Sequence, residues 1–319
     1  FPSELHVVFH GPVLEVLDEK ELAVILAHEF AHHELHRLED HAFQLAEQIL
    51  TAMANDSAAT PVHERTLRNL RLQTELYCDR RALQVTGEAD ACIRTLVKME
   101  TGLRQVSAQA YLQQATEVMR SGKVFSEGVT HPEMFIRTYA IQAWDSSGED
   151  SDQEIARIIS GGLRLDDMDL LQQQSAFEMT RFLISRMLDP PWMQTTITME
   201  LARRFFSDAL SDDRSLMDFL RERDGSNGQT KQCVAELQCE KLRKYFCYVL
   251  LDFATIDPEL DETALAQGFQ IAAEVQLSRE FQQAAGELRI SKRTLQRIQT
   301  DAAQLVKAAV EAQQAEVTS

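Results

Sequence analysis

Residues Leu22–His33 read LAVILAHEFAHH, an apolar run that passes directly into the pattern His-Glu-x-x-His. The spacing of its apolar residues predicts a helix with Asp18 or a neighbour as N-cap and an end near Leu38. On such a helix, His28 and His32 are four residues apart, so both imidazoles project from one face and can hold one Zn²⁺. This stretch therefore predicts a zinc-binding helix near the start of the chain.

A catalytic zinc ion needs a third protein ligand and an open fourth position. Glu29 is placed to act as general base toward a metal-activated water at that position. The site at which metzincin proteases carry their third ligand is occupied by Leu38, so a carboxylate from a later helix is the alternative. Glu75 fits, and Asp79, one turn further on the same face, is predicted to accept a hydrogen bond from a zinc-bound imidazole and so orient it.

A third segment, Thr130-His131-Pro132, is followed by Arg137. We expect His131 to donate a hydrogen bond to the oxyanion that forms when water adds to a peptide carbonyl, and Arg137 to anchor nearby acidic groups. Taken alone, these residues are more often a His-Pro helix start with a surface arginine.

Together these segments resemble the HtpX/CAAX-prenyl-protease (Ste24-like) family of zinc metallopeptidases over roughly the first 140 residues. The resemblance implies that His28, His32 and Glu75 bind one Zn²⁺ per chain and that Glu29 is the general base. It implies hydrolysis of peptide bonds in protein or peptide substrates. It also implies a mainly α fold, in which a zincin-like (gluzincin) catalytic domain contains a small β-sheet.

The run Leu5–His10 (LHVVFH) is rich in β-branched and aromatic residues and ends at a Gly-Pro turn, so it predicts a strand of that sheet. In this type of peptidase, a strand just before the active-site helix tends to form the edge of the cleft. We therefore expect Val7, Val8 and Phe9 to pair with the backbone of the substrate. An ordinary internal strand is an equally good interpretation.

The membrane-embedded members of this family have spanning helices, whereas the longest strongly apolar run here, Tyr245–Leu251, is too short to cross a bilayer. We therefore expect a soluble branch, located in the cytoplasm, for which the processing of prenylated proteins is not implied. The net charge of −18 disfavours binding to nucleic acid and to anionic membranes. The five cysteines form no Cys-x-x-Cys pair and are expected to be reduced, with Cys78 as a buried structural residue.

The polar, acidic stretch 145–152 predicts a linker between the metallopeptidase domain, residues 1–144, and an all-helical domain, residues 153–319. Within the latter, Leu250–Glu262 resembles the helix and acidic turn of a TerB-like domain. That resemblance implies a regulatory or interaction role, with a regulatory protein partner. The acidic residues Asp257–Glu262 are expected to cap a helix rather than to bind a hard cation.

Two functions remain open at this point. The first is a soluble zinc-dependent endopeptidase with a regulatory or substrate-recruiting helical domain. The second is a non-proteolytic or latent zinc-containing interaction protein that works through its helical C-terminal domain.

Overall fold

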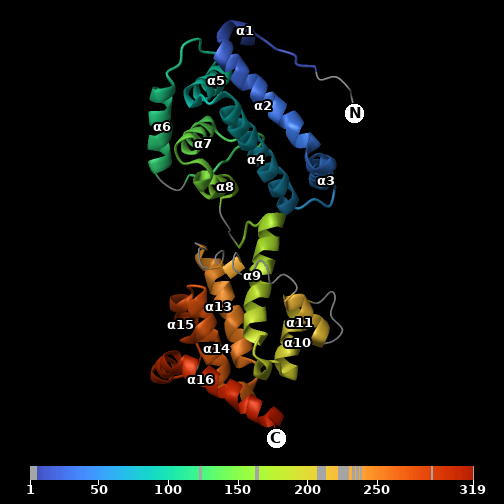
Figure 1. Cartoon of the computed structure of the whole chain (residues 1–319), viewed down its shortest axis with the longest axis vertical. Coiled ribbons are helices and arrows are strands. Elements are labelled where there is room, and N and C mark those ends of the chain that lie inside the picture. The colour runs from blue at the N-terminus through green and yellow to red at the C-terminus, as the bar shows by residue number, and fades with distance from the viewer. Residues whose placement is uncertain are drawn as a thin grey trace. The chain divides into compact units, whose positions relative to one another are not determined.

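The computed structural model describes residues 6–121, 124–161, 165–206, 213–221, 239–288 and 290–318, together with residues 230, 231, 234 and 237. The chain divides into two compact units, Phe1–Gly162 and Leu163–Ser319. Each unit has a hydrophobic core of its own, and every regular element described in either unit is a helix (Figure 1). The expected linker, 145–152, lies inside the first unit, so the division falls later in the chain than we expected.

The first unit is a set of helices packed around the pair α2 and α4 (Figure 1). Helix α5 packs against α2, and α7 packs against α4, α5 and α6. The elements are α1 (Val13–Val16), α2 (Glu19–Arg37), η1 (Leu38–His41), α3 (Ala42–Asn55), α4 (Pro61–Thr86), α5 (Ala89–Thr101), α6 (Ala108–Arg120), α7 (Met134–Ser147), η2 (Gly148–Ser151) and α8 (Asp152–Ser160).

Helix α2 begins where the sequence predicts. Asp18 is the N-cap, and its side chain accepts a hydrogen bond from the backbone N–H of Glu21 while Glu21 accepts one from Asp18 in return. The Glu21 side chain is fully buried and accepts from Lys98 Nζ at 2.7 Å and from Arg94 Nε at 3.1 Å, both on α5. These two ion pairs hold the first turn of α2 against α5, because the buried Glu21 carboxylate would be unstable without its basic partners.

The small β-sheet predicted for this unit is wrong. Residues 6–10 have no regular secondary structure, and Val7, Val8 and Phe9 are 40%, 68% and 37% exposed; Leu5 lies outside the described residues. A strand is stable only when its backbone pairs with a neighbour, and the described part of the chain offers none. The pairing with substrate expected of Val7–Phe9 depended on that strand, so the structure gives it no support.

The second unit is all-helical in the residues described. Its elements are α9 (Leu170–Leu188), η3 (Pro191–Met193), α10 (Thr196–Phe205), α11 (Asp213–Arg221), α13 (Glu240–Thr255), η5 (Pro258–Leu260), α14 (Asp261–Glu274), α15 (Ser278–Ala285) and α16 (Lys292–Thr318). Asp257 caps η5 by accepting from the backbone N–H of Glu259, and Glu262 pairs with Arg297. The acidic turn thus serves capping and ion pairing.

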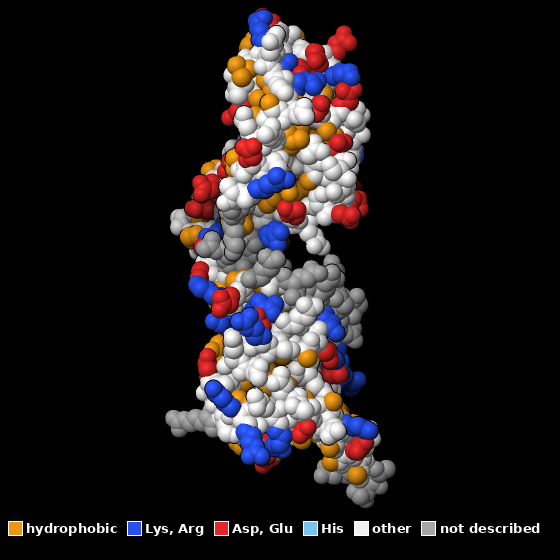
Figure 2. Space-filling model, turned by 90° about the vertical axis from the view of Figure 1, so that its left-hand side faces the viewer, with side chains coloured by type: hydrophobic (Ala, Val, Ile, Leu, Met, Phe, Trp, Pro, Cys, Tyr) orange, Lys and Arg blue, Asp and Glu red, His pale blue; other side chains and the backbone are white. Residues whose placement is uncertain are grey.

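The surface carries charges of both signs (Figure 2), and the described cysteines are unpaired with one another. Acidic and basic side chains are interspersed on the face shown in Figure 2. None of the described helices is long and apolar enough to span a membrane. The four described cysteines, Cys78, Cys92, Cys239 and Cys247, are free thiols, and Cys233 lies outside the described residues.

Candidate metal centre

Helices α2 and α4 lie side by side and bring His28 and His32 opposite Glu75. The Nε2 atom of His28 is 3.5 Å from Oε2 of Glu75, and the Nε2 atom of His32 is 3.5 Å from Oε1 of the same carboxylate. The two imidazole rings meet edge to face with centroids 5.0 Å apart. Two imidazole nitrogens and one carboxylate therefore converge on a single small volume, and this is a donor set that zinc takes in catalytic sites.

A buried network behind these residues orients His28. Its Nδ1 atom lies 3.0 Å from Oδ1 of Asp79, and because a carboxylate can only accept, Nδ1 carries the proton and Nε2 is directed at Glu75. Arg137 on α7 donates to the same Asp79 carboxylate from Nε at 2.7 Å and from Nη2 at 2.6 Å. Asp79 is 3% exposed, so this bidentate pair is shielded from solvent.

The network separates the pKa values of the two imidazoles. Burial alone would lower the pKa of His28, but its hydrogen bonds with Asp79 and Glu75 outweigh burial and raise the pKa to about 9. The pKa of His32 is lowered by burial and by the neighbouring His28. The pKa of Glu75 is lowered because contacts with His28 and Arg137 outweigh the effect of burial. Zinc would displace the proton on His28, as metal binding to imidazole requires.

Glu29 and His131 lie at the open side of the same constellation. Glu29 is exposed and directly follows His28 on α2. The Nε2 atom of His131 is 3.5 Å from Oε1 of Glu75, although His131 stands in the loop before α7 and its side chain is 59% exposed. The structure thus brings together His28, Glu29, His32, Glu75, Asp79, His131 and Arg137, whose roles the sequence predicts.

The loop that carries His131 is tied down by contacts that the motifs did not indicate. Arg68 on α4 donates to the carbonyl oxygen of Ser126, and the N–H of Ser126 donates to the carbonyl of Ile158. Gly128 faces the carbonyl oxygen of His131 so closely that a Cβ atom there would lie 2.0 Å from it. A glycine requirement of this kind leaves no pattern in a single sequence.

Cys78 offers a second donor set. Its Sγ atom and one ligand nitrogen each from His28 and His32 all lie within 4.8 Å of one another. Cys78 is fully buried, and this burial raises the pKa of its thiol, which favours the neutral form over the thiolate that binds metal. The carboxylate of Glu75 lies 3.5 Å from the Nε2 atom of each imidazole, and its pKa is lowered, so it offers the charged form that binds metal.

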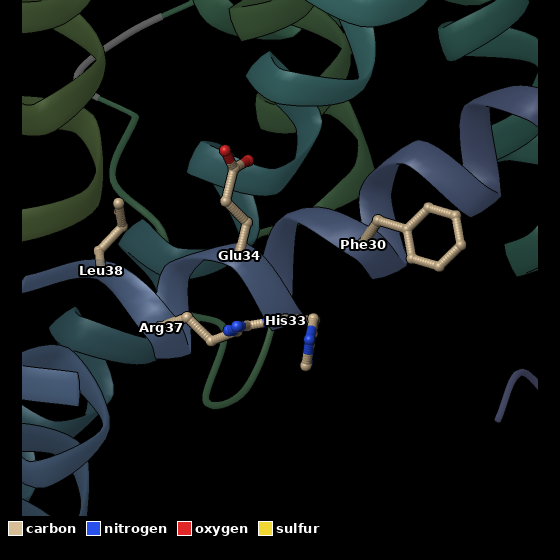
Figure 3. A pocket seen from close by; sticks show the side chains of 5 residues that line it. All are labelled: Phe30, His33, Glu34, Arg37 and Leu38. Carbon is tan, nitrogen blue, oxygen red and sulfur yellow. The ribbon is translucent and has the colours of Figure 1, made fainter. Parts of the chain in front are cut away.

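Two hollows lie on this unit. The larger, about 420 Å³, is lined only by residues of α2, namely Phe30, His33, Glu34 and Arg37, and by Leu38 just beyond it. Figure 3 shows the Glu34 side chain pointing away from those of His33 and Arg37, so this hollow does not gather polar groups around one point. The smaller cavity, about 170 Å³, is lined by α2, α4, α5, α7 and the loop before α7, and its lining includes His28 and Glu75 of the candidate metal site.

Comparison with known proteins agrees with this geometry. Residues 1–145 match the model of peptidase family M48. The "Plastoglobule-localized metallopeptidase 48, chloroplastic" of Arabidopsis thaliana is 29% identical over an alignment of 163 residues, and the match covers 45% of this chain and 46% of that protein. The chain therefore spans less than half the length of this relative. No solved structure matches the chain.

The match covers the same part of the chain as the three motifs and the buried network that joins them. The similarity to peptidase family M48 is accordingly confined to residues 1–145, the part of the chain that carries the candidate metal centre.

Proposed function

We propose that the first unit is a zinc endopeptidase that holds one ion per chain through His28, His32 and Glu75. The observation that carries the proposal is the convergence of two imidazole nitrogens on the two oxygens of one carboxylate, each at 3.5 Å. The donor chemistry fits zinc, since the Asp79 carboxylate fixes the tautomer that leaves Nε2 of His28 free to bind. A bound zinc ion would polarise the scissile carbonyl and lower the pKa of water.

Three side chains of the first unit would then transfer the proton, stabilise the oxyanion and position the ligands. Glu29 borders the cavity next to His28, where its carboxylate can take a proton from the attacking water and return it to the leaving amine. His131 borders it from the loop before α7 and can donate to the developing oxyanion. A donor of that kind typically contributes roughly 10²- to 10³-fold in turnover. Arg137 pairs with Asp79 and Glu75 and so ties α7 to the ligand helix α4.

The test is zinc quantification combined with proteolysis of an unfolded substrate such as casein. Glu29→Gln should retain zinc and lose cleavage, because the amide keeps the shape of the side chain but cannot accept the proton. Glu117→Gln, at an exposed acid on α6, is the matched control and should behave as wild type. Cleavage by Glu29→Gln at the wild-type rate would refute the mechanism, and a wild-type chain without zinc would refute the site.

We propose a regulatory or substrate-recruiting role for the second unit, because it has a hydrophobic core separate from that of the first. Comparing the full chain with residues 1–162 tests this role. Greater activity of the shorter chain would indicate autoinhibition, and a zinc-loaded protein inactive in both forms would favour the interaction protein instead. The TerB-like resemblance and a cytoplasmic location stay predictions.

A further inference from the structure

The imidazole of His131, the proposed oxyanion donor, is not held in place by the packing of its own side chain. That side chain is 59% exposed. Its Nδ1 atom lies 3.0 Å from Oγ1 of Thr130, which is itself exposed, and its Nε2 atom lies 3.5 Å from Oε1 of Glu75. A group that stabilises an oxyanion has to be held within about 0.5 Å of its productive position before the reaction begins. The backbone of the loop therefore has to fix this imidazole.

The loop before α7 is fixed at both ends. At its start, Ser126 donates its N–H to the carbonyl oxygen of Ile158 on α8 at 3.0 Å and accepts a hydrogen bond from the side chain of Arg68 on α4. At its end, Pro132 is buried, and its ring restricts the backbone. The described residues 127–131 between these ends form no helix or strand, so the segment that carries the imidazole needs a further contact.

One side chain spans that segment. The Oε1 atom of Glu133 accepts a hydrogen bond from the backbone N–H of Glu127 at 2.7 Å, which closes residues 127–133 into a ring that contains His131. Glu133 is the N-cap residue of α7, and an N-cap side chain ordinarily accepts from the first turn of its own helix. The Glu133 side chain makes no such bond with α7, whose first turn is fully described. Its carboxylate closes the loop instead.

The Glu133 carboxylate is held in this orientation. Its other oxygen, Oε2, is buried and has no hydrogen-bond partner among the residues that the structure describes. A buried acceptor without a partner is unfavourable, and it persists where the surrounding structure fixes the group. The N–H of Glu127 does so through its hydrogen bond, and the positive charge of Arg68 attracts the carboxylate.

We propose that Glu133 is a positioning residue, which closes the loop at the N–H of Glu127 and so sets the point from which His131 donates to the oxyanion. The proposal rests on the proposed peptidase function, since the oxyanion arises in that reaction. The described residues that line the cavity include His131 but not Glu133, so Glu133 acts through His131 and not on the substrate.

The experiment compares kcat, KM and zinc content of full-chain variants on an unfolded substrate. Glu133→Ala removes the acceptor and should lower kcat by roughly 10- to 100-fold, since a misplacement of about 1 Å can cost about 10²-fold. KM and zinc content should change little. Glu133→Gln keeps an oxygen that can accept from the N–H of Glu127 and should retain most of kcat. Glu127→Ala, the matched control, removes an exposed carboxylate of the same loop but keeps that N–H and should behave as wild type.

A double-mutant cycle separates positioning from a general effect on the fold. If Glu133 acts through His131, Glu133→Ala should lower kcat in the otherwise wild-type chain and change it little in the His131→Ala background. A loss of equal size in both backgrounds would overturn the proposal. The same conclusion would follow if Glu133→Gln were as impaired as Glu133→Ala.

A second readout does not depend on activity. In the metal-free protein, hydrogen exchange at the Glu127 amide, followed by NMR, should be faster in Glu133→Ala than in wild type and close to wild type in Glu133→Gln. Equal exchange in all three overturns the proposal. Wild-type kcat in His131→Ala also overturns it, while the zinc endopeptidase stands. A wild-type chain that binds zinc but cleaves nothing overturns both.

Discussion

Replacing Asp79 by Asn removes the buried charge that joins α4 to both α2 and α7. The Asp79 carboxylate accepts two hydrogen bonds from Arg137 and one from the Nδ1 atom of His28, and it is 3% exposed. An asparagine oxygen can replace part of this acceptance, but its NH₂ group only donates and would face a donor. The variant therefore loses the ion pair and one hydrogen bond at least.

The expected loss of unfolding free energy follows from Arg137, which the variant leaves buried without its main ion-pair partner. The Arg137 side chain is 11% exposed, and its remaining acidic neighbour is Glu75 at 3.7 Å. Removing one partner of a buried ion pair typically costs about 3–5 kcal/mol. Most domains have an unfolding free energy of about 5–15 kcal/mol, so the variant should fold. Zinc affinity should fall by roughly 10- to 100-fold, because His28 loses the group that orients it.

Two measurements check this prediction. Urea denaturation of the metal-free protein, followed by circular dichroism, gives the loss of unfolding free energy. Competition with a chromophoric chelator gives the zinc affinity. Asp90→Asn, at an exposed position on α5, is the control for removing a carboxylate. If Asp79→Asn changes neither quantity more than Asp90→Asn does, the reasoning about the buried network is refuted.

Three further outcomes are expected. Folding raises the pKa of His28 from 6.5 to about 9, so protonated His28 stabilises the metal-free protein by on the order of 3 kcal/mol below pH 6.5. This stabilisation is lost as pH rises through 9, and an unchanged urea midpoint at pH 6.5 and 9.5 would contradict it. Gly128→Ala should lower kcat while zinc content is kept, since the new Cβ displaces His131; wild-type kcat would show that the loop geometry is unimportant. Glu21→Gln should reduce unfolding free energy by about 3–5 kcal/mol, because Lys98 is left buried without its charge partner, and a loss under about 1 kcal/mol would argue against that pairing.

The sequence predicted the helical elements that carry the site because their signals are local. Asp18 caps α2 as expected, and the four-residue spacing of His28 and His32 places both rings on one side of that helix. Cys78 is buried, as expected of a structural cysteine. The strand at Leu5–His10 failed for the opposite reason, since β-propensity shows that a segment suits a sheet and does not show that a partner strand exists.

The features missed by the sequence depend on contacts between distant helices. Met99 and Leu96 on α5 have the spacing of ordinary amphipathic positions, and only the packing of α5 beside α2 places them in a wall next to the metal site. The Arg68 side chain holds the His131 loop at the carbonyl oxygen of Ser126, and Gly128 lies against the carbonyl oxygen of His131. Contacts with backbone atoms do not depend on the type of the contacted residue, so the sequence shows no pattern for them. The linker prediction at 145–152 followed composition, whereas those residues continue the helical packing of the first unit.

The most direct test of the central claim is the X-ray absorption spectrum of the zinc-loaded protein. The account predicts one zinc ion per chain with a shell of nitrogen and oxygen only, at about 2.0–2.2 Å, from His28, His32 and Glu75. A sulfur ligand at about 2.3 Å would assign the site to Cys78 instead. That result, or a shell that is unchanged in Glu75→Ala, would contradict the account.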